Sequence, residues 1–295
     1  KEICISPEVK VALGISADKL SPSQLISAIL KAPVDLLWNG GIGTYVKGEF
    51  EDNNEIGDKA NDNLRILGKN LRCKVVGEGG NLGFTQKGRI EFARQGGLIN
   101  TDFIDNSGGV DCSDHEVNIK IALQHEIEQK NINLEERNKI LSRLSSDIEI
   151  LVLEDNHNQS ILLNMESYSD INNLKDYSWL INCLEEKGDL LREVESLPSQ
   201  EDITKLELEK KSLTRPEIAV LVAYAKNSIA KILSSFDFTK EDFFQKILLS
   251  YFPKYLQQNF EQSIMLHKLG NEIIITVISN EFVNTLGCTT FHLLK

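Results

Sequence analysis

Short apolar runs alternate with amphipathic stretches over the first 120 residues of the chain. Residues 34–38 and 73–77 have the length and apolar character of buried strands, and a third strand is expected within 98–104. Helical patterns occupy three further stretches, at 21–30, 55–67 and 85–95. Strands that alternate with helices predict βαβ units and a mainly parallel sheet.

Farther along, the apolar positions recur at the spacing of α-helices. Ser113 is a candidate N-cap for a helix that reaches about Lys130, and residues 134–153 continue the helical pattern. Residues 214–217 (TRPE) combine a capping threonine, a first-turn proline and an acidic third position, which is typical of a helix start. The apolar run 218–224 is expected to lie inside a bundle rather than to form a partner groove.

Glycine content divides the chain near residue 120. Sixteen of the 19 glycines lie in residues 1–120, and glycine marks places where the backbone bends sharply or approaches another group closely. We therefore expect two domains, 1–120 and 121–295, with a fold class of α/β followed by all-α. A length of 295 residues is sufficient for two hydrophobic cores.

Composition and charge exclude several classes of protein. A net charge of −12 argues against binding to nucleic acid. No apolar run reaches the ~18 residues of a membrane span, so a cytoplasmic protein without a membrane partner is expected. The five cysteines are scattered, which predicts reduced thiols rather than a zinc site or a disulfide framework. The chain begins with lysine rather than methionine, and we expect it to be a piece of a longer polypeptide.

Three glycine-rich turns are the main candidates for a binding site. They follow the three expected strands and comprise residues 38–44 (WNGGIGT), 77–83 (GEGGNLG) and 105–110 (DNSGGV). In an open parallel sheet, ligands bind outside the carboxyl ends of the strands. Glycines at these ends let a ligand approach the backbone N–H groups.

The second turn has a partial resemblance to a dinucleotide-binding fingerprint. Gly77, Gly79 and Gly83 follow a strand and precede a helix, and Asp102 lies at about the distance of a ribose-binding acid. The spacing departs from the fingerprint because Leu82 stands where a glycine is required. Ordinary βα turns of an α/β protein remain an equally good interpretation.

Other chemical patterns have simpler structural explanations. Ser113, Asp114 and His115 contain the residue types of a catalytic triad, but consecutive helical side chains diverge. Five acidic residues could form a hard-cation site, although turn and cap roles explain them as well: Asp102, Asp105, Asp111, Asp114 and Glu116. Four isolated histidines are better explained as packed or surface residues than as metal ligands: His125, His157, His267 and His292. No metal site is therefore predicted.

Longer phrases in the sequence resemble one enzyme family. The segments LWNGGIGTYVK, KVVGEGGNLGFTQKGRIEFA and INTDFIDNSGGVDCSDHEVNIK are similar to the large NAD-specific glutamate dehydrogenases of bacteria. In the helical part, LEDNHNQS, LTRPEIAVLVAYAK and HKLGNEIIITVISNEFVN support the same resemblance. It covers nearly the whole chain. It implies a partial Rossmann-like NAD-binding domain at 1–120 and a C-terminal helical domain at 121–295.

The resemblance also implies a reaction and roles for particular residues. The reaction is oxidative deamination of L-glutamate to 2-oxoglutarate and ammonia, with hydride passing to NAD. By similarity, Asn81 and Asn106 lie beside the nicotinamide ribose and amide, and the turn at Asn39, Gly40 and Gly41 borders the cofactor. Val110 and Ser113 are implied to contact the side-chain end of the substrate.

The family's catalytic lysine and aspartate, and its phosphate-binding loop, are expected N-terminal to this chain. No catalytic residue is therefore predicted within residues 1–295, and the chain is expected to be inactive alone. It is expected to form a homo-oligomer or to need the N-terminal portion. The alternative is a non-catalytic helical scaffold with a degenerate α/β part.

Overall fold

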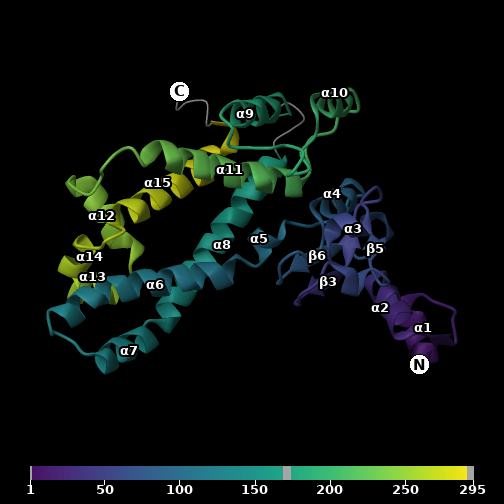
Figure 1. The fold of residues 1–295 in the computed structure, drawn as a ribbon, viewed down its shortest axis with the longest axis horizontal. Helices are drawn as coiled ribbons and strands as arrows, with labels where there is room; N and C mark the ends of the chain where they lie inside the picture. Colours follow the sequence, from purple (N-terminus) through teal and green to yellow (C-terminus); the bar gives the residue numbers. More distant parts are fainter. Residues whose placement is uncertain (1, 169–173, 291–295) are drawn as a thin grey trace. The chain divides into compact units, whose positions relative to one another are not determined.

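Two pairs of parallel strands form the sheets of the N-terminal part. The computed structural model describes residues 2–168 and 174–290. In it, β3 (Leu36–Asn39) pairs in parallel with β6 (Val75–Glu78), and Asn39 lies opposite Glu78 (Figure 1). The second pair is β4 (Val46–Lys47) with β5 (Ile66–Leu67). The strands expected at 34–38 and 73–77 are therefore confirmed, each shifted by one or two residues toward its carboxyl end.

Side-chain caps define the helices around these sheets. Ser21 begins α2 (Pro22–Leu30) with a reciprocal capping box, and the Thr85 hydroxyl accepts the Gly88 N–H at the start of α4 (Gln86–Arg94). Both helices were expected from the sequence. The remaining small elements are β1 (Ile3–Cys4), α1 (Pro7–Leu13), β2 (Lys19–Leu20), α3 (Asn53–Ile56), η1 (Lys59–Asn61), η2 (Gly68–Asn70) and α5 (Asp102–Asp105).

Two expectations for this part are wrong. Residues 55–67 do not form one helix, because Gly57 adopts φ 76° and ends α3 after a single turn, and the chain then continues through η1 to β5. The strand expected within 98–104 is reduced to one bridge between Leu98 and Val75, and α5 follows it. The Asp105 side chain, at the end of α5, accepts the Glu78 N–H at the end of β6. This hydrogen bond favours the helical turn of α5 over a third strand.

The remainder of the described chain is helical. Its elements are α6 (Ser107–Glu128), α7 (Leu134–Arg143), α8 (Ser145–Tyr168), α9 (Leu174–Glu186), α10 (Gln200–Leu208), α11 (Arg215–Leu233), α12 (Asp242–Tyr251), α13 (Lys254–Asn259), α14 (Glu261–Met265) and α15 (Gly270–Leu286). The pattern at 134–153 is divided between α7 and α8. Residues 218–222 of α11 are buried, as the apolar run predicted.

The first turns of α6 correct the prediction for Ser113. The helix begins at Ser107, so Ser113 lies in its second turn and is not an N-cap. Gly108 and Gly109, expected in a third glycine-rich turn, are helical as well. The helix therefore begins six residues, or about 1.7 turns, before the expected cap. The Ser107 hydroxyl accepts a hydrogen bond from Asn156 Nδ2 at 3.1 Å, which joins the start of α6 to α8.

The chain folds into two compact units, each built from two separate stretches. One unit comprises Lys1–Asn106 with Ser167–Val220, and the other comprises Ser107–Glu166 with Leu221–Lys295. The first has a core around Val46, Val76 and Phe84, and the second has a core around Leu123, Phe252 and Ile274. A mixed α/β part followed by a mostly helical part confirms the predicted fold class. The domain boundary near residue 120 stays a prediction.

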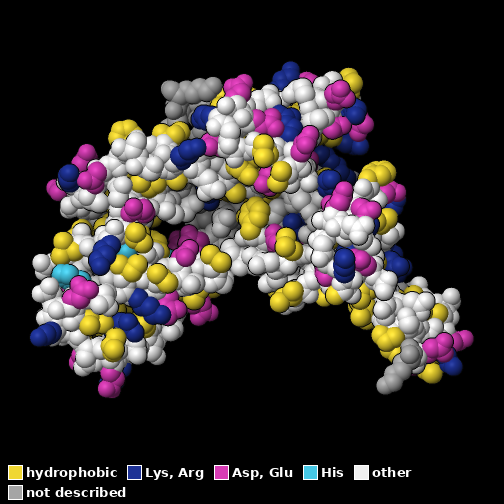
Figure 2. All heavy atoms as spheres, in the orientation of Figure 1, with side chains coloured by type: hydrophobic (Ala, Val, Ile, Leu, Met, Phe, Trp, Pro, Cys, Tyr) yellow, Lys and Arg dark blue, Asp and Glu magenta, His cyan; other side chains and the backbone are white. Residues whose placement is uncertain are grey.

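Among the described helices, none has both the length and the apolar content of a membrane span. On the face drawn in Figure 2, acidic and basic side chains are interspersed, and apolar side chains reach the surface in several places.

Candidate functional site

The first two glycine-rich turns meet at the carboxyl ends of β3 and β6. The Asn39 carbonyl oxygen accepts the N–H groups of Gly79 and Gly80, at 2.8 and 3.1 Å. A methyl group added at Gly80 would lie 2.5 Å from the Gly41 carbonyl oxygen, so the two turns are in direct backbone contact. The structure therefore brings Asn39 and its neighbours Gly40 and Gly41 beside the second turn.

The glycines of the second turn make room for the protein's own side chains. The Trp38 indole lies over Gly77 and Gly79, where a Cβ atom would be 2.7 and 2.5 Å from ring carbons. A Cβ atom at Gly83 would overlap the Asn39 amide. Internal packing thus accounts for the glycines that suggested a fingerprint, and ordinary βα turns explain them better.

Leu82 has the backbone conformation that glycine usually adopts, with φ 57°. Two interactions hold it there. Its N–H donates to Asp102 Oδ2 at 2.8 Å, and its carbonyl oxygen accepts the Thr44 hydroxyl at 2.7 Å. Asp102, the candidate ribose acid of the fingerprint interpretation, therefore supports the turn.

A buried ion pair lies directly beneath these turns. Glu78 is fully buried, and both of its carboxylate oxygens bind the Arg89 guanidinium, at 2.7 and 3.0 Å. Asp102 Oδ2 lies 3.3 Å from the same guanidinium. Burial raises the pKa of Glu78, and the positive charge of Arg89 acts against this rise.

The Glu78–Arg89 pair was not predicted from the sequence. Glu78 Oε1 also accepts the Phe84 N–H at 3.1 Å, and Asp105 Oδ2 accepts the Glu78 N–H at 2.9 Å. The Glu78 side chain therefore connects the end of β6 to the following turn and, through Arg89, to α4. The Glu78 backbone N–H connects the same strand end to α5. A glutamate at a strand end followed by a helical arginine was the available signal, but many surface residues have the same pattern.

Asn81 and Asn106 are hydrogen-bonded to each other. Asn106 Nδ2 donates to Asn81 Oδ1, although the two residues belong to different turns. Neither amide makes another hydrogen bond within the described part of the chain, so the Asn81 NH2 group remains available as a donor and the Asn106 oxygen as an acceptor. Asn81 is exposed and Asn106 is half-buried.

The Asn39 amide has a different environment. Its oxygen accepts the Gly41 N–H at 3.4 Å, and its nitrogen is buried with no hydrogen-bond partner among the described residues. A buried amide donor without a partner is uncommon in folded proteins. Asn39 is therefore the unsatisfied polar group of this turn.

Val110 and Ser113 lie one helical turn apart on α6, and both are exposed. They belong to the compact unit that begins at Ser107, whereas the asparagines and glycines above belong to the other unit. His115 is buried and stacks on Tyr251 with ring centroids 4.7 Å apart. Because Ser113 is exposed and His115 is not, the consecutive Ser-Asp-His letters do not form a triad.

The five acidic residues considered as a cation site do not form one cluster. Asp102 and Asp105 accept backbone N–H groups around β6, as described above. Asp111 instead lies near His115 and Asp155, and Asp155 was not among the five candidates. Burial raises the pKa of Asp111, and the like charge of Asp155 raises it further.

The other histidines have individual environments. His125 Nδ1 lies 3.2 Å from the Ser263 hydroxyl, and His267 Nε2 lies 3.0 Å from the Asn118 carbonyl oxygen. Burial lowers the pKa of His267. His157 is exposed on α8, and His292 lies outside the described residues.

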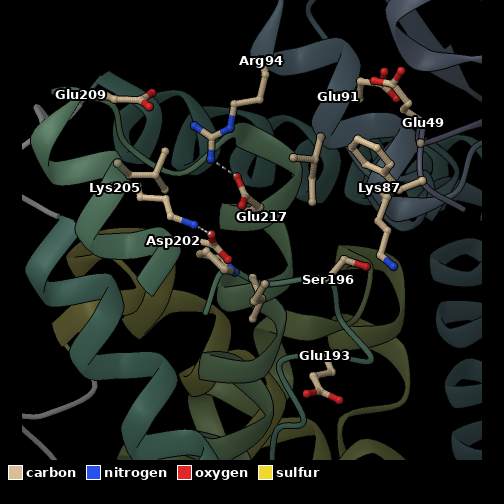
Figure 3. A pocket seen from close by; sticks show the side chains of 16 residues that line it. Glu49, Lys87, Glu91, Arg94, Glu193, Ser196, Asp202, Lys205, Glu209 and Glu217 are labelled. Carbon is tan, nitrogen blue, oxygen red and sulfur yellow. Dashed lines mark hydrogen bonds and ion pairs between the residues drawn. The ribbon is translucent and has the colours of Figure 1, made fainter. Parts of the chain in front are cut away.

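A separate cavity of about 940 Å³ lies among α4, α10 and the start of α11 (Figure 3). Two ion pairs lie in its wall: Arg94 binds Glu217 and Lys205 binds Asp202, each at 3.0 Å. Glu217 also accepts the Thr214 N–H and hydroxyl, which confirms the expected helix start. None of the site residues expected from the sequence lines this cavity.

Two family models match the chain. Residues 1–166 match the model described as bacterial NAD-glutamate dehydrogenase, catalytic domain. Residues 210–295 match the model described as glutamate dehydrogenase, C-terminal. The first match covers more than half of the chain.

Curated relatives agree with these models. The NAD-specific glutamate dehydrogenase of Pseudomonas aeruginosa is 44% identical over 295 residues, which is 100% of this chain. Enzymes of the same name from Halomonas elongata and Mycobacterium tuberculosis are 42% and 41% identical over 97% and 98% of the chain. The chain spans 18% of the length of each relative. Because the catalytic-domain model and the relatives agree along the sequence, the chain belongs to the bacterial NAD-glutamate dehydrogenase family.

Proposed function

We propose that this chain supplies one wall of the nicotinamide site and the side-chain end of the substrate site in an NAD-dependent glutamate dehydrogenase. The reaction is the conversion of L-glutamate, NAD and water to 2-oxoglutarate, ammonia and NADH. The observation that carries the proposal is the hydrogen-bonded pair of Asn81 and Asn106 beside the ends of β3 and β6. Family membership supports the choice of cofactor and substrate.

The amides of this pair have the chemistry that a nicotinamide and its ribose require. A carboxamide needs both a donor and an acceptor, and the pair leaves the Asn81 NH2 group and the Asn106 oxygen available for these roles. Asn39 lies at the end of the neighbouring strand with an unsatisfied amide donor, and Gly40 and Gly41 leave the adjoining backbone accessible. When bound, NAD accepts the hydride. The chain's own contribution is to orient the ring and ribose through these amides.

The substrate contact is proposed for the exposed face of α6. A serine hydroxyl can donate to the carboxylate at the side-chain end of glutamate, and a valine one turn earlier can pack against its methylene groups. Ser113 lies in the second turn rather than at an N-cap, so the helix dipole supports a bound carboxylate less than the sequence indicated. The proposed contact is therefore mainly the hydrogen bond from the Ser113 hydroxyl to the substrate carboxylate.

We further propose that the proton-transferring lysine and aspartate are provided by polypeptide outside this chain. The relatives are more than five times as long as the matched segment. Within the described residues, one edge of β3 has no partner strand, and Leu36 and Trp38 are more than half exposed. These features support additional contacts with an N-terminal portion or a second subunit.

We expect NADH to bind to the polypeptide that contains this chain and Asn106→Ala to weaken the binding. Loss of one neutral hydrogen bond costs about 0.5–1.5 kcal/mol, so Kd should rise roughly two- to tenfold. The measurement is a titration followed by nicotinamide fluorescence, with Asn54→Ala as control because Asn54 is exposed on α3. If NADH does not bind, even with the N-terminal portion added, the non-catalytic scaffold is the better explanation.

Ser113→Ala should raise the KM for glutamate and leave the KM for NAD nearly unchanged. A hydrogen bond to a charged group contributes about 1.5–3 kcal/mol, which corresponds to roughly a 10- to 150-fold change in KM. Initial rates of NADH formation at varied glutamate and varied NAD separate the two constants. Cys112→Ala is the matched control because Cys112 is the exposed neighbour on α6. Equal kinetics for Ser113→Ala and the parent would remove Ser113 from the substrate site.

A further inference from the structure

Three potential metal ligands converge between α6 and α8. Asp111 and His115 lie one turn apart on α6, and Asp155 lies on α8. His115 Nε2 is 3.8 Å from Asp111 Oδ1 and 3.9 Å from Asp155 Oδ2. One ligand atom from each residue lies within 4.8 Å of the other two. Val110 and Ser113 are not part of this cluster.

His115 is buried without a hydrogen-bond partner. The residue is 3% exposed, and its Nδ1 atom has no partner among the described residues. Its Nε2 atom faces two carboxylates at distances too long for hydrogen bonds. A buried imidazole normally satisfies its nitrogens, and a group bound between Nε2 and the two carboxylates would satisfy Nε2, the nitrogen that faces them.

The surrounding cavity is strongly acidic. It has a volume of about 400 Å³ and is lined by no lysine or arginine among the described residues. Six carboxylates line it: Asp111, Asp114, Glu154, Asp155, Glu272 and Glu281. Like charges at this density repel one another, and a bound cation would reduce the repulsion.

We propose that Asp111, His115 and Asp155 bind a divalent transition-metal ion of the zinc or manganese class, which fastens α6 to α8. Neutral imidazole and carboxylate oxygens are ordinary ligands for such ions. In a tetrahedral site with bonds of about 2.0–2.2 Å, neighbouring donors are roughly 3.3–3.6 Å apart. Both carboxylates therefore need to move toward the imidazole when the ion binds, and the half-exposed Asp155 side chain has room to do so.

A neighbouring lysine, Lys226, would oppose a metal ion at this site. It lies on α11 and interacts electrostatically with Asp155. Its ammonium group would repel a nearby divalent ion. Replacement of Lys226 by methionine, which keeps much of its apolar length, is therefore expected to strengthen metal binding.

The test is calorimetric titration of the full chain with Zn2+ alone, followed by a thermal melt with and without the ion. One Zn2+ per chain and a higher Tm are expected. Asp155→Asn keeps the side-chain shape but removes a ligand charge. It should raise the Kd at least about tenfold and reduce the Tm increase at the same Zn2+ concentration.

Matched variants distinguish this site from other possible zinc ligands. Asp147→Asn removes the same charge from an exposed position on α8, and Cys112→Ser removes an exposed thiol near Asp111. Neither should change the Kd. Absence of saturable binding, equal affinity in Asp155→Asn and the parent, or loss of binding in Cys112→Ser would each overturn the proposal. Cobalt substitution provides a second readout, because tetrahedral coordination gives visible absorption that Asp155→Asn should remove.

Discussion

Arg89→Met is expected to lower the free energy of unfolding by about 3–5 kcal/mol, because it leaves the buried Glu78 carboxylate without its partner. Both oxygens of Glu78 bind the guanidinium, and Glu78 is fully buried. Methionine retains most of the apolar volume of the arginine side chain. The loss should therefore come mainly from the uncompensated charge. Chemical denaturation followed by circular dichroism measures it.

The effect of Arg89→Met should depend on pH. Burial raises the pKa of Glu78 above its ordinary value of 4.5, and removal of the positive charge should raise it further. A carboxyl group with a raised pKa in the folded state stabilises the fold at low pH and loses that contribution as pH rises through the folded pKa. The deficit of the variant should therefore be smallest near pH 4.5 or below and should grow toward pH 7.

Lys87→Met is the matched control for this experiment, since Lys87 is an exposed cation on the same helix. Its unfolding free energy should differ from the parent by less than about 0.5 kcal/mol. A deficit of the same size in both variants, or one that does not change with pH, would contradict the assigned role of the Glu78–Arg89 pair. If Arg89→Met also weakens NADH binding, the pair supports the turn that carries Asn81.

Phe252→Ala is expected to lower the free energy of unfolding by about 3–5 kcal/mol through the cavity that it leaves. Phe252 is 1% exposed in the core of the second compact unit, where it contacts the rings of Tyr251 and His267. The helices that pack around Phe252 relax only partly after such a substitution, so part of the space remains empty. Denaturant unfolding gives the free-energy difference directly.

Phe243→Ala is the internal comparison for Phe252→Ala. Phe243 lies on α12 and is 68% exposed, so the same substitution removes little buried surface. Its effect should be less than about 0.5 kcal/mol. Similar losses at both positions would show that the second unit is not organised around Phe252.

Helix starts were predictable because their interactions are local. The caps at Ser21, Thr85 and Thr214 involve residues only three positions away, and the sequence pattern identifies each of them. The two buried strands were likewise evident from short apolar runs. Local signals failed where a single glycine or a tertiary contact decided the outcome, as at Gly57 and at the start of α6.

Long family motifs identified the candidate site residues but not their arrangement. The segments around Asn81 and Asn106 resemble a known family, yet the direct hydrogen bond between the two amides appears only in the fold. The sequence could not indicate that Asn39 lies under Gly83 with an unsatisfied donor. Those features depend on how the ends of β3 and β6 approach each other.

The amino-acid order alone determined the family, the change from α/β to helical structure, and the places where glycine-rich turns follow strands. These properties are encoded in contiguous residues, since helix caps, strand length and motif letters depend on near neighbours. Only the tertiary structure decided which charges are paired or clustered. Glu78 with Arg89, and Asp111 and His115 with Asp155, come from different elements, and their energies depend on burial that no local pattern specifies.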